Sequence, residues 1–263
     1  MTAIAVDGFT VAPYTYDGVT HDVYRRGTGP GVIIIHEIPG LTPKVAAFGR
    51  RVADAGFTAV LPSLFCTPNK PPTMPYAMGE MVKACVSREF ATFAMGRTSA
   101  ATVWLRALAR DVHAELGGPG VGAVGMCLTG GFALAMMLDE HTVAPVLSQP
   151  SLPFPMGGSR RSAIGLSDED TAKVQARATA GCDVLGLRFT GDPFVKAERF
   201  EALRQLLGEH FIAVEIDSSP GNAYGIPKAA HSVLTEHLVD EPGHPTADAL
   251  NQVLEFFRAR LSG

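Results

Sequence analysis

Residues 121–135 read Val-Gly-Ala-Val-Gly-Met-Cys-Leu-Thr-Gly-Gly-Phe-Ala-Leu-Ala. A short strand of small apolar residues leads through Gly125 to Cys127, and a helix-forming apolar run follows. This order is typical of a nucleophile elbow, a sharp strand-to-helix turn that holds a reactive side chain. Gly125 and Thr129 must be small because main chain packs against main chain in such a turn. The amides at the start of the following helix would favour a thiolate at Cys127.

The composition points to one large α/β domain. The chain has 263 residues, 46% of them hydrophobic, with a formal net charge of −4 and a pI near 6.1. We therefore expect residues 1–263 to form a single domain. The charge argues against a nucleic-acid partner, and no apolar run approaches the roughly 18 residues of a membrane span. The N-terminus lacks a basic stretch followed by an apolar core, so we expect a cytoplasmic protein.

The cysteines give no sign of a disulfide framework or a metal centre. The four, Cys66, Cys85, Cys127 and Cys182, are widely spaced and include no Cys-x-x-Cys pair. We expect all four to be reduced thiols and expect no metal site.

Strand and helix patterns alternate along the chain. Residues 10–28 predict a hairpin that turns at Tyr16-Asp17-Gly18. Further strands are expected at 31–36, 57–61, 121–125, 143–148, 183–190 and 211–216, and helices at 43–55, 99–116, 128–139, 168–180, 196–207 and 246–261, the last capped by Thr246. The segments 66–97 and 150–167 are expected to be loops that shape a pocket. This alternation predicts a mostly parallel central sheet with helices on both faces.

Three strand ends carry reactive residues in the order nucleophile, acid, base. Cys127 follows the strand at 121–125, Asp192 follows the strand at 183–190, and His231 follows the last strand after a glycine-containing loop. This is the order of the α/β-hydrolase fold, in which His231 would deprotonate the thiol and Asp192 would orient the imidazole. The alternatives are that Cys127 is a small buried apolar residue and that Asp192 is a turn residue. Asp217 competes as the acid, and the competing histidines are His36, His210, His237 and His244.

The turn after the strand at 31–36 supplies the remaining candidates. It reads His36-Glu37-Ile38-Pro39-Gly40. In this fold the turn contributes one oxyanion-hole donor, so we expect the amides of Ile38 and Leu128 to form that hole. Glu37 is expected to face the site, where its charge would disfavour the thiolate or its oxygens would accept the thiol hydrogen. The alternative for Glu37 is a solvent-facing residue at a strand end.

Together these pieces resemble the dienelactone hydrolase family. The matching stretches are His36-Glu-Ile-Pro-Gly-Leu, Ala55-Gly-Phe-Thr-Ala-Val-Leu-Pro62, Gly125-Met-Cys-Leu-Thr-Gly-Gly131 and Ala230-His231, in the family's order. The resemblance implies a Cys127, Asp192 and His231 triad with Glu37 governing the cysteine. It also implies hydrolysis of small esters or lactones through an acyl-thioester, without a metal or organic cofactor.

The chain departs from the family pattern at several positions. The family's elbow has glycine where this chain has Thr129, a residue that is still small. The family's arginine one turn after the histidine, which binds a substrate carboxylate, is replaced by Thr235. Arg88 and Arg97 are the candidates to take over such substrate binding, although both are equally interpretable as surface residues.

Other functions use the same residues. A small-ligand binding or sensing protein on this scaffold would have the triad geometry broken. A thioesterase or acyltransferase would share the acyl-enzyme with an esterase, so the sequence does not separate these activities.

Overall fold

The computed structural model describes residues 3–71, 73–86, 99–152 and 162–263. The strands are β1 (Thr10–Tyr16), β2 (Val19–Arg26), β3 (Gly31–Ile35), β4 (Thr58–Pro62), β5 (Val121–Met126), β6 (Thr142–Ser148), β7 (Val184–Phe189) and β8 (Phe211–Ile216). The helices of this part of the chain are α1 (Pro43–Asp54), α2 (Met74–Val86), α4 (Ala100–Leu116), α5 (Gly130–Met136), α7 (Asp168–Thr179), α8 (Ala197–Leu207) and α9 (Pro245–Leu261).

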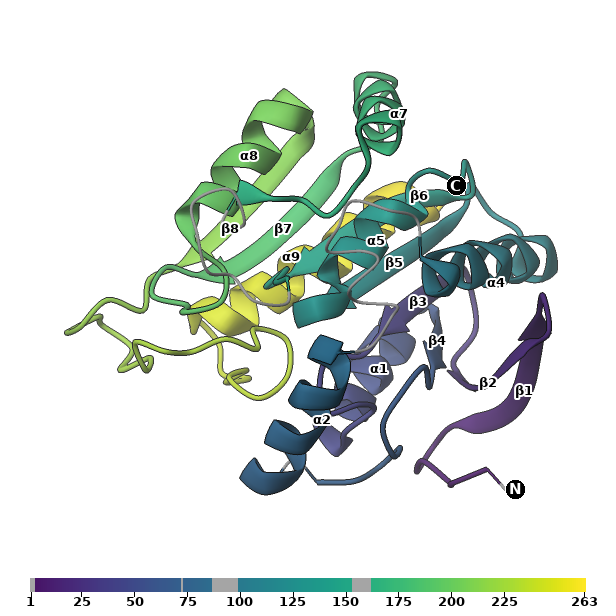
Figure 1. Ribbon diagram of the computed structural model, residues 1–263, viewed down its shortest axis with the longest axis horizontal. Helices are drawn as coiled ribbons and strands as arrows, with labels where there is room; N and C mark the ends of the chain where they lie inside the picture. The colour runs from purple at the N-terminus through teal and green to yellow at the C-terminus, as the bar shows by residue number, and fades with distance from the viewer. Residues whose placement is uncertain (1–2, 72, 87–98, 153–161) are drawn as a thin grey trace.

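The strands form one eight-stranded sheet in the order β1-β2-β4-β3-β5-β6-β7-β8. β1 and β2 form the predicted antiparallel hairpin, and β2 also pairs with β4 in antiparallel fashion. From β4 to β8 every pairing is parallel. The sheet is therefore mostly parallel, as the sequence predicts, and the carboxyl ends of β3, β5, β6, β7 and β8 lie along one edge (Figure 1).

Helices cover both faces of this sheet because alternate residues of each strand point to opposite sides. In β3, Val32 and Ile34 pack with apolar residues of α1 and α9, whereas Ile33 and Ile35 pack with residues of α4 and α5. A third apolar cluster joins α5, α7 and α8 over β6 and β7. All of β3 is consequently buried, and it reads as an unbroken apolar run rather than an alternating one.

Helix α1 begins and ends where its sequence signals predict. The hydroxyl of Thr42 caps it by accepting from the amide of Val45, and Pro43 occupies its first turn. The expected apolar face of Val45, Phe48 and Val52 is fully buried.

Three sequence expectations differ from the structure. The segment 66–97, expected to be a loop, contains α2, which begins after Thr73 and has Pro75 in its first turn, where a missing amide does no harm. The cap of α9 is His244 rather than Thr246: the imidazole of His244 accepts from the amide of Thr246, and Pro245 takes the first helical position. The expected helix at 128–139 is also shorter, because a 3₁₀ turn at Cys127–Thr129 precedes α5.

Candidate functional site

Cys127 is the first residue of the 3₁₀ turn that connects β5 to α5, and its backbone is strained there. Its φ of 56° is in the left-handed region, which a non-glycine residue rarely adopts. A Cβ at Gly125 would collide with the carbonyl oxygen of Thr129, and one at Gly130 would meet Cα of Pro150 at 2.6 Å. The turn therefore needs glycine at both positions, and this geometry is that of the elbow predicted from the sequence.

Thr129 preserves the elbow and also ties it to β3. Its hydroxyl oxygen accepts from the amide of Met126 at 2.9 Å. The same hydroxyl lies within hydrogen-bond distance of the carbonyl oxygens of Ile35, at 3.0 Å, and His36, at 3.2 Å. The hydroxyl of Thr129 thus fixes the turn that carries Cys127 against the turn that carries Glu37 and Ile38.

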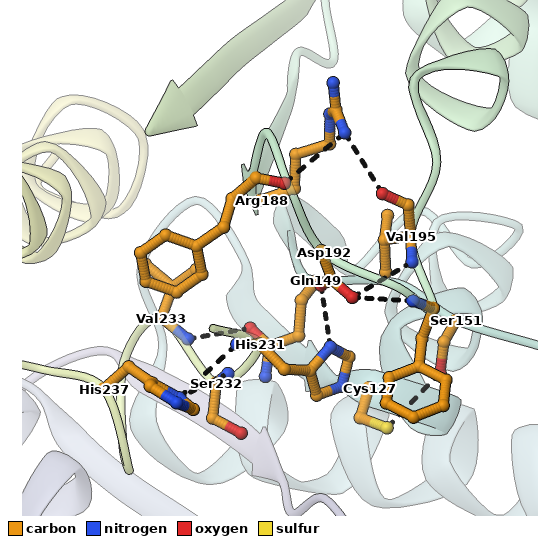
Figure 2. A network of polar contacts seen from close by, with 12 residues as sticks. Cys127, Gln149, Ser151, Arg188, Asp192, Val195, His231, Ser232, Val233 and His237 are labelled. Atoms are coloured by element: carbon orange, nitrogen blue, oxygen red, sulfur yellow. Dashed lines mark hydrogen bonds and ion pairs between the residues drawn. The ribbon is translucent and has the colours of Figure 1, made fainter. Parts of the chain in front are cut away.

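Asp192 and His231 form a buried hydrogen-bonded pair. Nδ1 of His231 lies 2.7 Å from Oδ2 of Asp192 (Figure 2). The other oxygen, Oδ1, accepts from the amides of Phe194, at 2.8 Å, and Val195, at 3.2 Å. The carboxylate is consequently held from two sides, and the ring of Phe194 packs edge-on against the imidazole at 5.3 Å between centroids.

The imidazole of His231 has its second nitrogen available toward the elbow. Burial lowers the pKa of His231, but the nearby Cys127 sulfur and the hydrogen bond to Asp192 outweigh burial and hold that pKa well above its usual value. Nε2 is buried, and apart from the Cys127 sulfur it has no hydrogen-bond partner among the described residues. The sulfur of Cys127 also lies 3.3 Å from Oγ of Ser151 (Figure 2).

His237 supports the loop that carries His231. Its Nδ1 accepts from the backbone amides of His231, at 3.4 Å, and Ser232, at 3.3 Å, so this nitrogen must be unprotonated. Burial lowers the pKa of His237, and this favours the required neutral form. From the sequence, His237 is only a competitor for the base, because an i to i+6 contact inside an irregular loop leaves no periodic signal.

Glu37 is buried, with 4% of its surface exposed, and does not face solvent. Its Oε2 accepts from Oγ of Ser232 at 2.6 Å and from Nε2 of Gln149 at 3.2 Å, and its Oε1 accepts from the hydroxyl of Thr235. Gln149 in turn accepts the amide of Val233 at 3.3 Å through Oε1. These side chains join the ends of β3 and β6 to the loop that carries His231, and every described partner of the carboxylate is neutral.

The two expected oxyanion-hole residues come from neighbouring strand ends. Leu128 follows Cys127 directly, and Ile38 packs against the apolar cluster that contains Cys127 and Leu128. The substrate-binding candidates Arg88 and Arg97 lie outside the described residues.

The rival residues are accounted for by other contacts. Asp217 is exposed and accepts the amide of Ser219 within its own loop. His36 is fully buried, and Nε2 of its ring accepts from the amide of Leu64 at 3.2 Å, while burial lowers its pKa to about 4. His210 pairs with Asp183. Of the candidates, Asp192 and His231 are the acid and the imidazole that meet beside the elbow.

Across the ranges that the structure describes, no three His, Cys, Asp or Glu side chains gather closely enough to hold a metal ion. None of the helices in those ranges combines the length and apolarity that a membrane-spanning segment needs.

Comparison with known proteins agrees with this architecture. A yeast protein that carries the name carboxymethylenebutenolidase (Saccharomyces cerevisiae) is 24% identical over 190 residues, which is 71% of this chain and 66% of that protein's own length. A structure from Klebsiella pneumoniae, named as a dienelactone hydrolase, superposes with a TM-score of 0.65 at 18% identity over 95% of this chain and 99% of that one. A lidless α/β serine hydrolase from Xanthomonas campestris covers 100% of this chain and 99% of its own, with a TM-score of 0.59 at 11% identity.

These likenesses show the α/β-hydrolase fold. The model of the dienelactone hydrolase family matches residues 20–261, a range that includes the Glu37 turn, the elbow and the loops that carry Asp192 and His231. From the match over nearly the whole chain, we conclude that this protein belongs to the dienelactone hydrolase family of hydrolases.

Proposed function

We propose that this protein hydrolyses small carboxylic esters or lactones with Cys127 as nucleophile, His231 as general base and acid, and Asp192 as the residue that orients the imidazole. The observation that carries this proposal is the Asp192–His231 hydrogen bond of 2.7 Å beside a cysteine with a φ of 56°. A buried Nε2 without another partner is available to exchange a proton with the sulfur.

In the first half of the reaction, Nε2 of His231 takes the proton of the Cys127 thiol. The sulfur attacks the carbonyl carbon of the substrate, and the carbonyl electron pair moves onto the oxygen. Asp192 stabilises the imidazolium through Nδ1, and this agrees with the raised pKa of His231. Collapse of the intermediate expels the alkoxide, which takes the proton from His231 and leaves an acyl-thioester on Cys127.

In the second half, His231 takes a proton from water, and the resulting hydroxide attacks the thioester carbonyl. The carbon–sulfur bond breaks, and the sulfur recovers its proton from His231, so the acid is released and the enzyme is restored. In both halves the negative oxygen would be held by the backbone amides of Ile38, in the turn after β3, and Leu128, the residue that follows Cys127.

Glu37 has two roles in this proposal. Its hydrogen bonds with Ser232, Thr235 and Gln149 hold the His231-bearing loop against the turn that supplies Ile38. Its buried charge also disfavours a second negative charge at Cys127 in the resting enzyme.

The test of this function is turnover of aryl esters of graded acyl length by the wild-type protein and by Cys127→Ala and His231→Ala. We expect wild-type turnover, an acyl adduct on Cys127 seen by mass spectrometry, and loss of turnover in both variants with the fold retained in circular dichroism. Chelator treatment should leave turnover unchanged.

A fully active Cys127→Ala protein would refute the proposal. Absence of any burst or turnover with the whole ester series would favour a binding protein. Transfer of the acyl group to added thiols or alcohols in preference to water would identify an acyltransferase instead.

A further inference from the structure

An exposed aromatic side chain lies against the imidazole of the proposed base. The ring of Phe194 packs edge-on against the ring of His231, with 5.3 Å between the centroids and 73° between the planes. Phe194 is 46% exposed, whereas the side chain of His231 is only 14% exposed. The contact with the imidazole therefore covers only part of the phenyl ring, and the rest is an apolar surface beside the group that would exchange protons.

The backbone that carries this ring is fixed, so the ring stays next to the imidazole. The amide of Phe194 donates to Oδ1 of Asp192 at 2.8 Å, and the amide of Val195 donates to the same oxygen at 3.2 Å. The side chain of Val195 is fully buried, and its carbonyl oxygen accepts from Nη1 of Arg188 at 3.1 Å (Figure 2). The carboxylate that orients His231 thus also holds the segment with the exposed ring. A surface fixed in advance loses little entropy when a ligand binds to it.

The order of proton transfers decides which part of an ester would meet this ring. When the first intermediate collapses, the leaving oxygen takes its proton from Nε2 of His231, so the alcohol portion must lie beside the imidazole at that moment. The acyl portion stays bonded to the sulfur of Cys127, and the alcohol has departed before water attacks the thioester. Because the ring of Phe194 is only 5.3 Å from the imidazole, the alcohol portion is the part of the substrate within its reach.

We propose that Phe194 is a specificity-determining residue that contacts the leaving alcohol and favours esters of apolar, ring-bearing alcohols such as phenols. This inference rests on the roles proposed for Cys127 and His231. A phenyl side chain packs favourably on another ring in offset or edge-on arrangements, and it has no donor or acceptor that would select a polar alcohol. Covering the exposed part of the ring with an apolar alcohol also removes apolar surface from water.

The test compares phenyl acetate with trifluoroethyl acetate in the wild type and in Phe194→Ala. Both alcohols are acidic and leave readily, but only phenol has a ring. We expect kcat/KM for phenyl acetate to fall about three- to tenfold relative to that for trifluoroethyl acetate, the size of one aromatic contact. The fall should appear in the acylation burst, because the alcohol leaves in that step. Phe194→Trp retains an aromatic surface and should keep the wild-type preference.

Tyr224→Ala is the matched control. Tyr224 is 54% exposed, and its ring packs edge-on against the imidazole of His244 with the same 5.3 Å between centroids and the same 73° between planes. His244 caps α9 and has no part in the proposed chemistry. This variant therefore removes an equivalent exposed ring from an imidazole, and its preference between the two acetates should equal that of the wild type.

A series of phenyl esters with acetyl, propionyl and butyryl groups varies the other side of the substrate. We expect the relative preference among these acyl groups to be the same in the wild type and in Phe194→Ala. A fall in kcat/KM confined to ring-bearing alcohols supports the proposal. An equal fall for both acetates, a changed acyl preference in its place, or the same loss in Tyr224→Ala would overturn it.

Binding of phenol gives a readout that needs no turnover. We expect phenol to shift the imidazole nuclear magnetic resonance signals of His231 in the wild type and to shift them much less in Phe194→Ala. That result in a protein that turns over no ester would support the ring as a binding surface for phenols and refute the hydrolase proposal. Ester turnover that depends on Cys127, with the same preference for phenyl acetate in the wild type and in Phe194→Ala, would refute only the role of Phe194.

Discussion

Two buried carboxylates lie within one site, and their hydrogen-bond partners differ. One carboxylate contacts a titratable imidazole, and the other contacts only neutral side chains among the residues that the structure describes. Asp192 accepts two backbone amides on one oxygen and an imidazole on the other. Glu37 accepts two hydroxyls and one side-chain amide, all neutral. Because a carboxylate next to an imidazole stabilises a positive charge on the ring, Asp192 is suited to supporting proton transfer by His231. Because a carboxylate surrounded by neutral donors cannot do so, Glu37 is suited to holding two loops together.

The largest effect should come from Asp192→Asn. The variant keeps an oxygen for the amides of Phe194 and Val195 but turns an amide group toward His231, which then presents the wrong tautomer to Cys127. We expect kcat for an aryl ester to fall by about 10³- to 10⁴-fold. The exposed Asp217→Asn is the matched control and should keep wild-type kcat. A loss smaller than tenfold in Asp192→Asn would contradict this difference between the two carboxylates.

Glu37→Gln should mainly affect stability. One of the three donors now facing the carboxylate would meet the new amide group and lose its acceptor, so the free energy of unfolding should fall by about 1–2 kcal/mol. We expect kcat to change by less than about tenfold, because no proton is transferred to Glu37 in the mechanism. Urea unfolding and steady-state kinetics measure both quantities, with the exposed Glu241→Gln as control. A loss of kcat comparable to that of Asp192→Asn would show that Glu37 takes part in the chemistry.

The raised pKa of His231 should make stability depend on pH. Since its pKa in the folded state lies above the unfolded value of about 6.5, its charge stabilises the fold fully below pH 6.5, and this contribution is lost as the pH rises through the raised value. One such group changes the free energy of unfolding by at most about 1.4 kcal/mol per pH unit. Asp192→Asn should reduce this pH dependence of the free energy of unfolding.

His36 should show the reverse dependence. Burial lowers its folded-state pKa to about 4, so its contribution is present above pH 6.5 and is lost as the pH falls toward 4. Nuclear magnetic resonance of the imidazole nitrogens follows both titrations directly. A His231 that titrates at or below 6.5 would contradict the site electrostatics described above.

The smallest effect should be that of Glu37 on the reactivity of Cys127. Removing its negative charge in Glu37→Gln should speed alkylation of Cys127 by iodoacetamide about threefold, because like-charge repulsion of the thiolate is relieved. An unchanged alkylation rate would leave Glu37 with its loop-holding role alone.

Sequence reasoning succeeded where the signal is local. Glycines at fixed spacing around Cys127 are required by the turn itself, so the elbow follows from residues that are adjacent in the chain. The order of residues at strand ends likewise predicted that Asp192 and His231 would meet, and their side chains lie 2.7 Å apart. It failed at α2, because a proline-rich start obscured the helix, and at the cap of α9, because two candidate caps flank Pro245.

The contacts that define the environment of the site were not predictable in this way. Ser151 lies in the segment 150–167, which was expected to be a pocket loop, Gln149 directly precedes that segment, and Thr235 was noted only for the arginine it replaces. Their partners are distant: Glu37 and Ser232 are 195 positions apart, and Cys127 and Ser151 are 24 apart. No periodicity relates such pairs, because only the parallel sheet brings their strand ends together.

The sequence by itself therefore determined the type of sheet, the elbow and the strand ends at which Cys127, Asp192 and His231 lie, since these depend on backbone geometry and apolar periodicity. Only the tertiary structure decided which partner each polar group has: His231 for Asp192, neutral donors for Glu37 and Ser151 for the sulfur of Cys127. The physical reason is that burial obliges every polar group to find a partner, and the available partners are set by how distant segments pack.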